Sequence, residues 1–191
     1  MGILVAGLLI FFAVHSVSIF NEPWRDSMVA KLGEWRWKGV YSLLAIIGFV
    51  LIVWGYSLAR IDPVILYSPP TWLRHVSMLI LVPVFPLLLA SYLPGRIQAM
   101  TRHPMLVATK LWALAHLLAN GMLADVILFG SFLVWAVIDR ISMKRRTQRS
   151  IPHAPPSKVN DSIAVLLGLA LYAAFVLWLH ARLIGVSLLA G

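Results

Sequence analysis

The sequence predicts an all-α fold, a polytopic membrane helix bundle of about six transmembrane helices that forms one domain over residues 1–191. Three observations lead to this prediction. Hydrophobic residues make up 61% of the chain and charged residues only 12%, whereas soluble domains have about 45–50% and about 25%. The apolar residues gather in segments of about 20, the length needed to cross a bilayer. The basic residues fall in alternate loops between these segments.

The expected membrane spans are residues 3–20, 39–58, 72–92, 104–120, 122–139 and 161–184. Only the stretch NGMLAD separates the fourth span from the fifth, and its Asn120 and Gly121 favour a helix end, so we expect a tight helical hairpin. Pro83 and Pro86 should kink the third span, because proline removes a backbone donor. The proline-rich stretch SIPHAPPSK, residues 150–158, is expected to be irregular.

The distribution of Lys and Arg predicts the orientation in a bacterial inner (cytoplasmic) membrane. Twelve of the sixteen lie in the first, third and fifth loops: Arg25, Lys31, Arg36, Lys38, Arg96, Arg102, Arg140, Lys144, Arg145, Arg146, Arg149 and Lys158. Arg60, Arg74 and Arg182 lie on the other side, and Lys110 falls inside the fourth span. Cytoplasmic loops carry the excess of basic residues, so both termini are predicted to be periplasmic. Anionic lipid explains the net charge of +9, and we expect no nucleic-acid partner.

Two histidines are expected near the middle of the membrane. From the helical rise, His15 lies about 18 Å from the outer end of the first span, and His116 about 18 Å from the inner end of the fourth. Both depths are within a few Å of the midplane of a core about 30 Å thick. The other histidines fall near the membrane surfaces or in a loop: His75, His103, His153 and His180.

Two imidazoles at the same depth on two helices are typical of a haem with an axial ligand on each face. The expected cofactor is therefore haem, with His15 and His116 as the ligands of its iron. Phe12 lies beside His15 on the first span, and Trp112 lies one turn before His116. Both aromatic side chains are expected to contribute to the cofactor site.

Several polar residues nearer the cytoplasm are candidates to bind the haem propionates. Lys110 lies about 9 Å closer to the cytoplasm than His116. Arg36 and Arg102 lie at the same interface as further candidates. His103 either binds a propionate or begins the fourth span as a cap. Without a propionate, Lys110 would pair with Asp139 or with a carbonyl, since a bare cation at this depth is costly.

A structural role for the two deep histidines is the alternative. Either could be a neutral imidazole that bonds a serine, an asparagine or a carbonyl across helices, with Ser16, Ser18 and Asn120 as candidates. Zinc is not expected, since a structural zinc site needs four ligands. The chain has no cysteine, and it places few carboxylates at depth.

The segments FAVHS (12–16), TRHPM (101–105) and LWALAHLLANG (111–121) resemble the NnrU family of bacterial membrane proteins, over nearly the whole chain. This resemblance implies a role in denitrification, in support of nitrite and nitric oxide reductase activity. The family is similar to the plant and cyanobacterial 15-cis-zeta-carotene isomerase, a haem b membrane enzyme. The isomerase's haem-binding histidines match His15 and His116. Its cysteine three residues before the second histidine is Ala113 here, so thiolate ligation is absent.

Three classes of function remain open. The first is a haem b protein of nitrogen oxide metabolism with a redox, gas-sensing or assembly role and a redox partner. The second is an enzyme, a haem-dependent polyene (carotenoid) cis–trans isomerase. The third is a membrane methyltransferase, which the RHP motif resembles. Such methyltransferases carry paired glutamates after the last hairpin, whereas the glutamates here, Glu22 and Glu34, both lie in the first loop.

Overall fold

The computed structural model describes residues 1–147, 149 and 152–188. These residues form helices, with a single isolated β-bridge and no β-strand among them. The all-α prediction is therefore confirmed. Residues 152–157 form no helix, as predicted for the proline-rich stretch, while its first residues, 150 and 151, lie outside the described part.

The helices belong to two compact units. Residues 1–69 and 120–148 form the first unit, and residues 70–119 and 149–191 form the second. The first unit contains α1 (Gly2–Phe20), α2 (Glu22–Leu32), α3 (Glu34–Ala59) and α8 (Leu123–Ser142).

Helix α2 is a helix that we did not predict. The first loop was expected to connect two spans, but its residues Glu22–Leu32 are helical. The side chain of Asn21 accepts a hydrogen bond from the backbone N–H of Trp24 at 3.0 Å, which caps the helix start. Helix α3 also begins earlier than residue 39, at Glu34, whose carboxylate lies 2.7 Å from the Lys38 ammonium one turn later.

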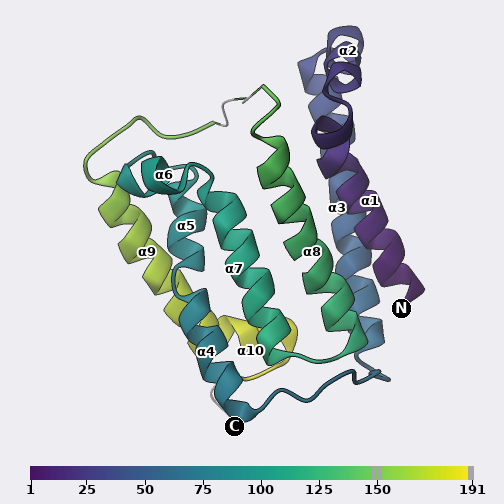
Figure 1. The fold of residues 1–191 in the computed structure, drawn as a ribbon, viewed down its shortest axis with the longest axis vertical. Coiled ribbons are helices and arrows are strands. Elements are labelled where there is room, and N and C mark those ends of the chain that lie inside the picture. The colour runs from purple at the N-terminus through teal and green to yellow at the C-terminus, as the bar shows by residue number, and fades with distance from the viewer. Residues whose placement is uncertain (148, 150–151, 189–191) are drawn as a thin grey trace. The chain divides into compact units, whose positions relative to one another are not determined.

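Helices α1 and α3 lie side by side (Figure 1) and approach closely through glycines. A Cβ atom at Gly7 would lie 2.6 Å from the backbone nitrogen of Ile52, and one at Gly48 would lie 2.8 Å from that of Phe11. Gly55 faces the backbone of Leu4 in the same way. Small residues let helix backbones pack tightly where water supplies no hydrophobic driving force. These glycines therefore define the α1–α3 interface.

The connection before α8 is hydrogen-bonded to the loop after α3. Only Asn120–Met122 separate α7 (Pro104–Ala119) from α8, so the connection is as short as predicted. The Gly121 carbonyl accepts from the backbone N–H of Leu66 at 2.8 Å. The Tyr67 hydroxyl donates to the Asn120 carbonyl at 2.7 Å. Burial, and then the Asp125 carboxylate, raise the pKa of the Tyr67 phenol, which keeps this donor protonated.

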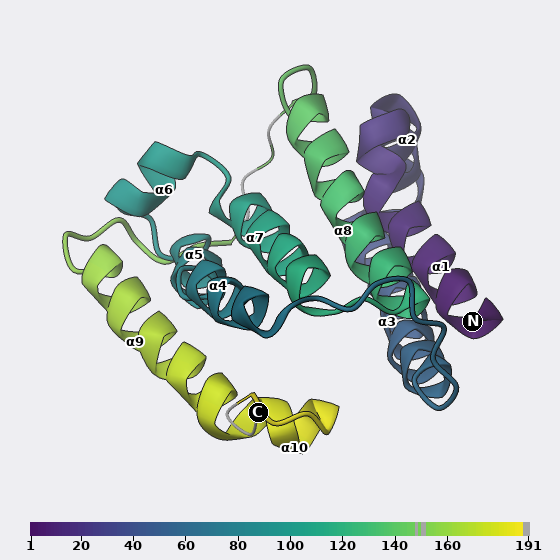
Figure 2. The same cartoon turned by 60° about the horizontal axis from the view of Figure 1, so that its bottom comes forward.

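The second unit contains, besides α7, the helices α4 (Thr71–Leu81), α5 (Val84–Ala90), α6 (Arg96–Thr101), α9 (Asn160–Ala174) and α10 (His180–Ile184), with the π-helix η1 (Phe175–Leu179) before α10. The third predicted span is interrupted between α4 and α5 at Pro83, as the proline predicted. Figures 1 and 2 show the chain bending between α9 and α10, where η1 lies. A π-turn inserted in a helix is a known cause of such a bend.

The core of the second unit lies between α5 and α7. Val84, Leu87 and Ala108 are buried there, and Trp112 packs against them. Asp161, in the first turn of α9, accepts hydrogen bonds from the backbone N–H groups of Arg96 and Ile97 at 2.8 and 3.1 Å. It thereby satisfies donors at the start of α6 that the helix itself leaves unpaired.

Four helical segments of the described residues are long and apolar enough to cross a membrane: Gly2–Phe20, Glu34–Ala59, Thr71–Ala90 and Asn160–Ile184. Helix α7 is apolar but shorter. Helix α8 has 20 residues and carries Asp125, Asp139 and Arg140. The chain is thus a membrane protein. The count of six spans stays a prediction, because α7 is shorter than a usual span and α8 carries three charged residues.

Candidate functional site

His15 lies on α1, where its ring is held by its own helix. Its Nδ1 lies 2.7 Å from the carbonyl oxygen of Phe11, four residues earlier. The imidazole stacks on the Phe11 ring, with 4.0 Å between centroids and 24° between planes. Because a carbonyl only accepts, the His15 proton resides on Nδ1, and Nε2 is the basic nitrogen of the ring.

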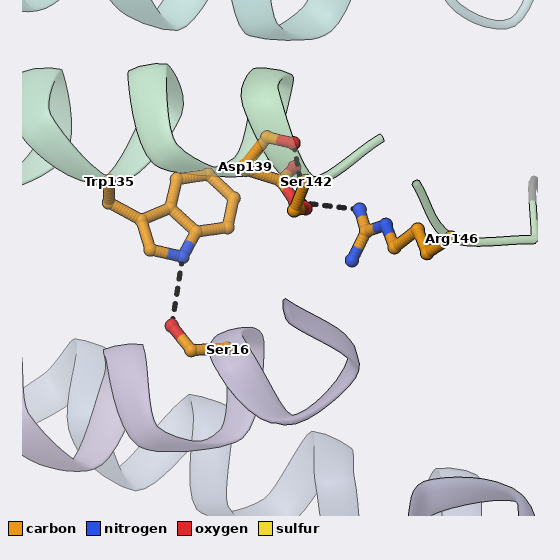
Figure 3. Close-up of polar contacts among 5 residues, drawn as sticks. All are labelled: Ser16, Trp135, Asp139, Ser142 and Arg146. Atoms are coloured by element: carbon orange, nitrogen blue, oxygen red, sulfur yellow. Dashed lines mark hydrogen bonds and ion pairs between the residues drawn. The ribbon is translucent and has the colours of Figure 1, made fainter. Parts of the chain in front are cut away.

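Aromatic side chains from three helices surround His15. Tyr41 of α3 and Trp135 of α8 meet it edge-on, at 5.3 and 6.1 Å between centroids. Phe12 stacks against Trp135 at 5.9 Å. The indole of Trp135 in turn donates a hydrogen bond of 3.1 Å to the hydroxyl of Ser16 (Figure 3). This shell is mainly aromatic, and the hydrogen bond to Ser16 fixes the orientation of Trp135 within it.

His116 lies on α7 in the second unit and has the same local arrangement as His15. Its Nδ1 lies 2.8 Å from the carbonyl oxygen of Trp112, again four residues earlier. The Trp112 ring lies 5.2 Å from the imidazole, tilted by 51°. Trp112 packs on the buried core of its unit, and this packing holds the turn of α7 that carries His116.

Both deep histidines thus direct Nδ1–H to a carbonyl of their own helix. Sequence reasoning had set a carbonyl across helices as the structural alternative, and the observed carbonyls are instead local ones. Ser16, a candidate partner of His15, instead accepts from Trp135. Metal-ligating histidines almost always donate their other ring N–H to a carbonyl, carboxylate or water, which fixes the tautomer and raises the basicity of the ligating nitrogen.

His103 directly precedes α7, while a role of its side chain as a cap or in binding a propionate stays a prediction. Its carbonyl accepts from the N–H groups of Leu106 and Val107 at 3.1 and 3.2 Å. Pro104 is the first helical residue, where its missing N–H costs nothing. Arg102, just before it, is exposed and has φ of +59°, a left-handed conformation that is uncommon outside glycine.

The remaining candidates for propionate binding are spread over both units. Arg36 is exposed on α3 in the first unit, whereas Lys110 is half-buried on α7 in the second. Lys110 belongs to none of the ion pairs Arg25–Asp26, Lys38–Glu34 and Arg146–Asp139. The other histidines are placed differently: His75 is exposed, and His153 and His180 bond nearby loop carbonyls.

Sequence reasoning missed the buried carboxylate of Asp125 on α8, and it offered the buried Asp139 only as a partner of Lys110, whereas its partner is Arg146. Asp125 accepts from the Tyr56 hydroxyl at 2.6 Å and from the Met122 backbone N–H at 2.9 Å. Asp139 accepts from the Arg146 guanidinium at 2.6 Å, beside Ser142 (Figure 3). The sequence did contain an indication of these contacts, because an acidic residue inside an apolar segment needs a partner. Tyr56, the partner of Asp125, lies 69 residues away on α3, so no local pattern points to it, whereas Arg146 follows Asp139 by seven residues, a spacing of two helical turns.

No group of three or more metal-ligating side chains lies together within the described residues. A metal held by two protein ligands, with the other positions supplied by a macrocycle, needs no such group. His15 in the first unit and His116 in the second each offer one imidazole Nε2, the kind of donor that ligates haem iron.

The fold and these residues define an all-α integral membrane protein with half-buried histidines on its apolar helices. The family model described as NnrU protein matches residues 3–188, across both units, and the chain belongs to the NnrU family. No curated protein and no solved structure matched the chain. The resemblance inferred from the FAVHS, TRHPM and LWALAHLLANG segments is thereby confirmed.

Proposed function

We propose that the protein binds one haem b, with His15 and His116 as axial ligands, and that it acts in nitrogen oxide metabolism. Its family supports a membrane protein related to that metabolism. The haem assignment is the further step. It rests on one observation above all: each of these histidines donates Nδ1–H to the carbonyl four residues earlier on its helix.

This arrangement prepares an imidazole for ligation in two ways. It places the proton on Nδ1, so Nε2 carries the lone pair that binds iron. It also orients the ring before the cofactor arrives, because rotation about the side chain would break the hydrogen bond. For His15, stacking on Phe11 adds a second restraint.

A bound haem supplies one-electron chemistry or gas binding at its iron. In this proposal Phe12 and Trp112 pack against the macrocycle. Lys110, Arg102, His103 and Arg36 are the candidates that hold its propionates. His15 and His116 would both hold the iron, and such a site would supply electron transfer, or sensing in which one histidine leaves.

The polyene cis–trans isomerase is the alternative within the same site. It needs the same two histidines and an added polyene substrate, so haem content does not separate the two functions. Incubation of the reduced protein with a cis-polyene, followed by chromatographic separation of isomers, does. Conversion above that of the His15→Ala variant would favour the isomerase.

The absorption spectrum of the purified protein tests the haem proposal. The wild type should show a Soret band and the sharp reduced bands of a low-spin, six-coordinate haem. His15→Ala and His116→Ala should each lose the six-coordinate spectrum, and the double variant should lose haem. His75→Ala, His153→Ala and His180→Ala are matched controls that should keep it. A wild-type spectrum in either deep single variant would overturn the pair and make His103 the next candidate.

A further inference from the structure

Helices α1 and α8 of the first unit border two hollows that share Phe20. The first has a volume of about 580 Å³ and is lined mainly by apolar residues of α1 from Val5 to Phe20, with Ile127 and Ser131 of α8. At a rise of about 1.5 Å per residue, this length of α1 spans about 22 Å. It exceeds the depth of one leaflet, about half of a hydrocarbon core about 30 Å thick.

The second hollow, of about 470 Å³, has both polar and apolar lining residues and lies where α1 and α8 end. Arg145 and Arg146 line it, together with the hydroxyl-bearing Ser18 and Ser142. Arg146 is held in place by its ion pair with Asp139, and a guanidinium has five N–H donors, so the pair leaves donors for a second anion. Arg145 is exposed.

The charge around the second hollow is positive. Residues 140–146 contain Arg140, Lys144, Arg145 and Arg146 and no acidic residue. Asp139 offsets Arg146, and Glu22, which also lines the hollow, offsets one more cation. Two positive charges remain, those of Arg140 and Lys144, which do not line the hollow, so contact with an anionic headgroup depends on the guanidinium donors of Arg145 and Arg146.

We propose that a phospholipid with an anionic headgroup occupies both hollows. Its phosphate lies against Arg145 and Arg146, and one acyl chain follows the groove along α1. Basic pockets beside transmembrane helices bind the headgroups of anionic lipids on the cytoplasmic side. Charged hydrogen bonds from arginine to phosphate are among the strong ones in proteins. The apolar groove distinguishes this site from general attraction of a basic loop to the membrane surface.

Competition between two lipids that differ only in the headgroup tests the proposal. The full chain, purified in detergent, is mixed with equal amounts of phosphatidylglycerol and phosphatidylcholine of the same acyl chains, and bound lipid is measured by native mass spectrometry. Phosphatidylglycerol should be retained in excess. Arg145→Gln should reduce that excess about fivefold, the effect expected for one basic residue near the headgroups.

Two control variants, Lys144→Gln and Ala6→Phe, test whether the lipid binds at this particular site. Lys144→Gln removes the same charge from the neighbouring residue, which does not line the hollow, and should keep the excess. Ala13→Phe fills the groove and should reduce retention of both lipids. Ala6→Phe, at an exposed residue of the same helix outside the groove, should not.

Arg146→Lys keeps a cation beside Asp139 but loses the forked donors, and it should weaken phosphatidylglycerol retention without unfolding the protein.

Three outcomes would overturn the proposal. Equal retention of the two lipids by the wild type would contradict a preference for the anionic headgroup. Equal losses in Arg145→Gln and Lys144→Gln would show surface attraction without a built site. Unchanged retention in Ala13→Phe would show that no acyl chain lies in the groove.

Discussion

The guanidinium of Arg146 lies 2.6 Å from the carboxylate of Asp139 at the end of α8, and their side chains are only 15% and 7% exposed. Ser142 lies beside them, with its hydroxyl donating to the Asp139 carbonyl at 2.9 Å (Figure 3). The pair holds the segment that follows α8 against the helix. Helix α8 itself continues to Ser142, beyond the predicted end at residue 139.

Loss of one partner of this pair should be costly. Arg146→Ala leaves the Asp139 carboxylate buried without its cation, and we expect the free energy of unfolding to fall by about 3–5 kcal/mol. Thermal unfolding in detergent, followed by tryptophan fluorescence, measures the change. Asp139→Asn combined with Arg146→Gln should recover most of the loss. Arg145→Ala, at an exposed position, is the control; an equal loss there would contradict a role for the pair.

A side chain at a glycine of the α1–α3 contact should destabilise the protein. Gly48→Ala places a methyl group against the backbone of Phe11, and we expect a loss of about 1–3 kcal/mol from overpacking. Gly39→Ala is the matched control on the same helix, because a Cβ there meets nothing within 4 Å. It should be neutral or stabilising by up to about 1 kcal/mol. Equal melting temperatures of the two variants would contradict the close approach.

Lys110 should contribute to haem retention without setting the iron ligation. In Lys110→Met the haem should dissociate faster to an acceptor protein, while the absorption bands of the bound form keep their positions. The reason is that a propionate contact binds the edge of the macrocycle and leaves the axial ligands unchanged. Lys38→Met, at an exposed lysine paired with Glu34, is the control. Unchanged dissociation in Lys110→Met would remove Lys110 from the site.

The basic loops predict that both termini are periplasmic. A reporter fused after Gly191, a residue outside the described part, should therefore report from the periplasm. The chain has no cysteine, so single engineered cysteines can report sidedness as well. In intact spheroplasts an impermeant thiol reagent should label Asp62→Cys and spare Ser157→Cys, both at exposed positions. The reverse labelling would contradict the charge rule for this chain.

The membrane character, the helical class and the family followed from the sequence by itself. Spanning segments must satisfy their backbone hydrogen bonds internally, so long apolar segments have to be helices. The break at Pro83 followed for the same local reason, because proline lacks the donor that a continuous helix needs. His15 and His116 could be selected from their spacing, since their expected depth depends only on the helical rise.

The tertiary structure decided the features that depend on residues distant in sequence or on the exact path of the backbone. The glycine contacts of α1 and α3 depend on which face each helix presents, and hydropathy does not fix that face when the helices are apolar all round. The partner of Asp125 is Tyr56 on α3, 69 residues away, and no local pattern records that contact. The Nδ1 hydrogen bonds of His15 and His116 depend on side-chain rotation, which the amino-acid order leaves undetermined and packing against Phe11 and Trp112 selects.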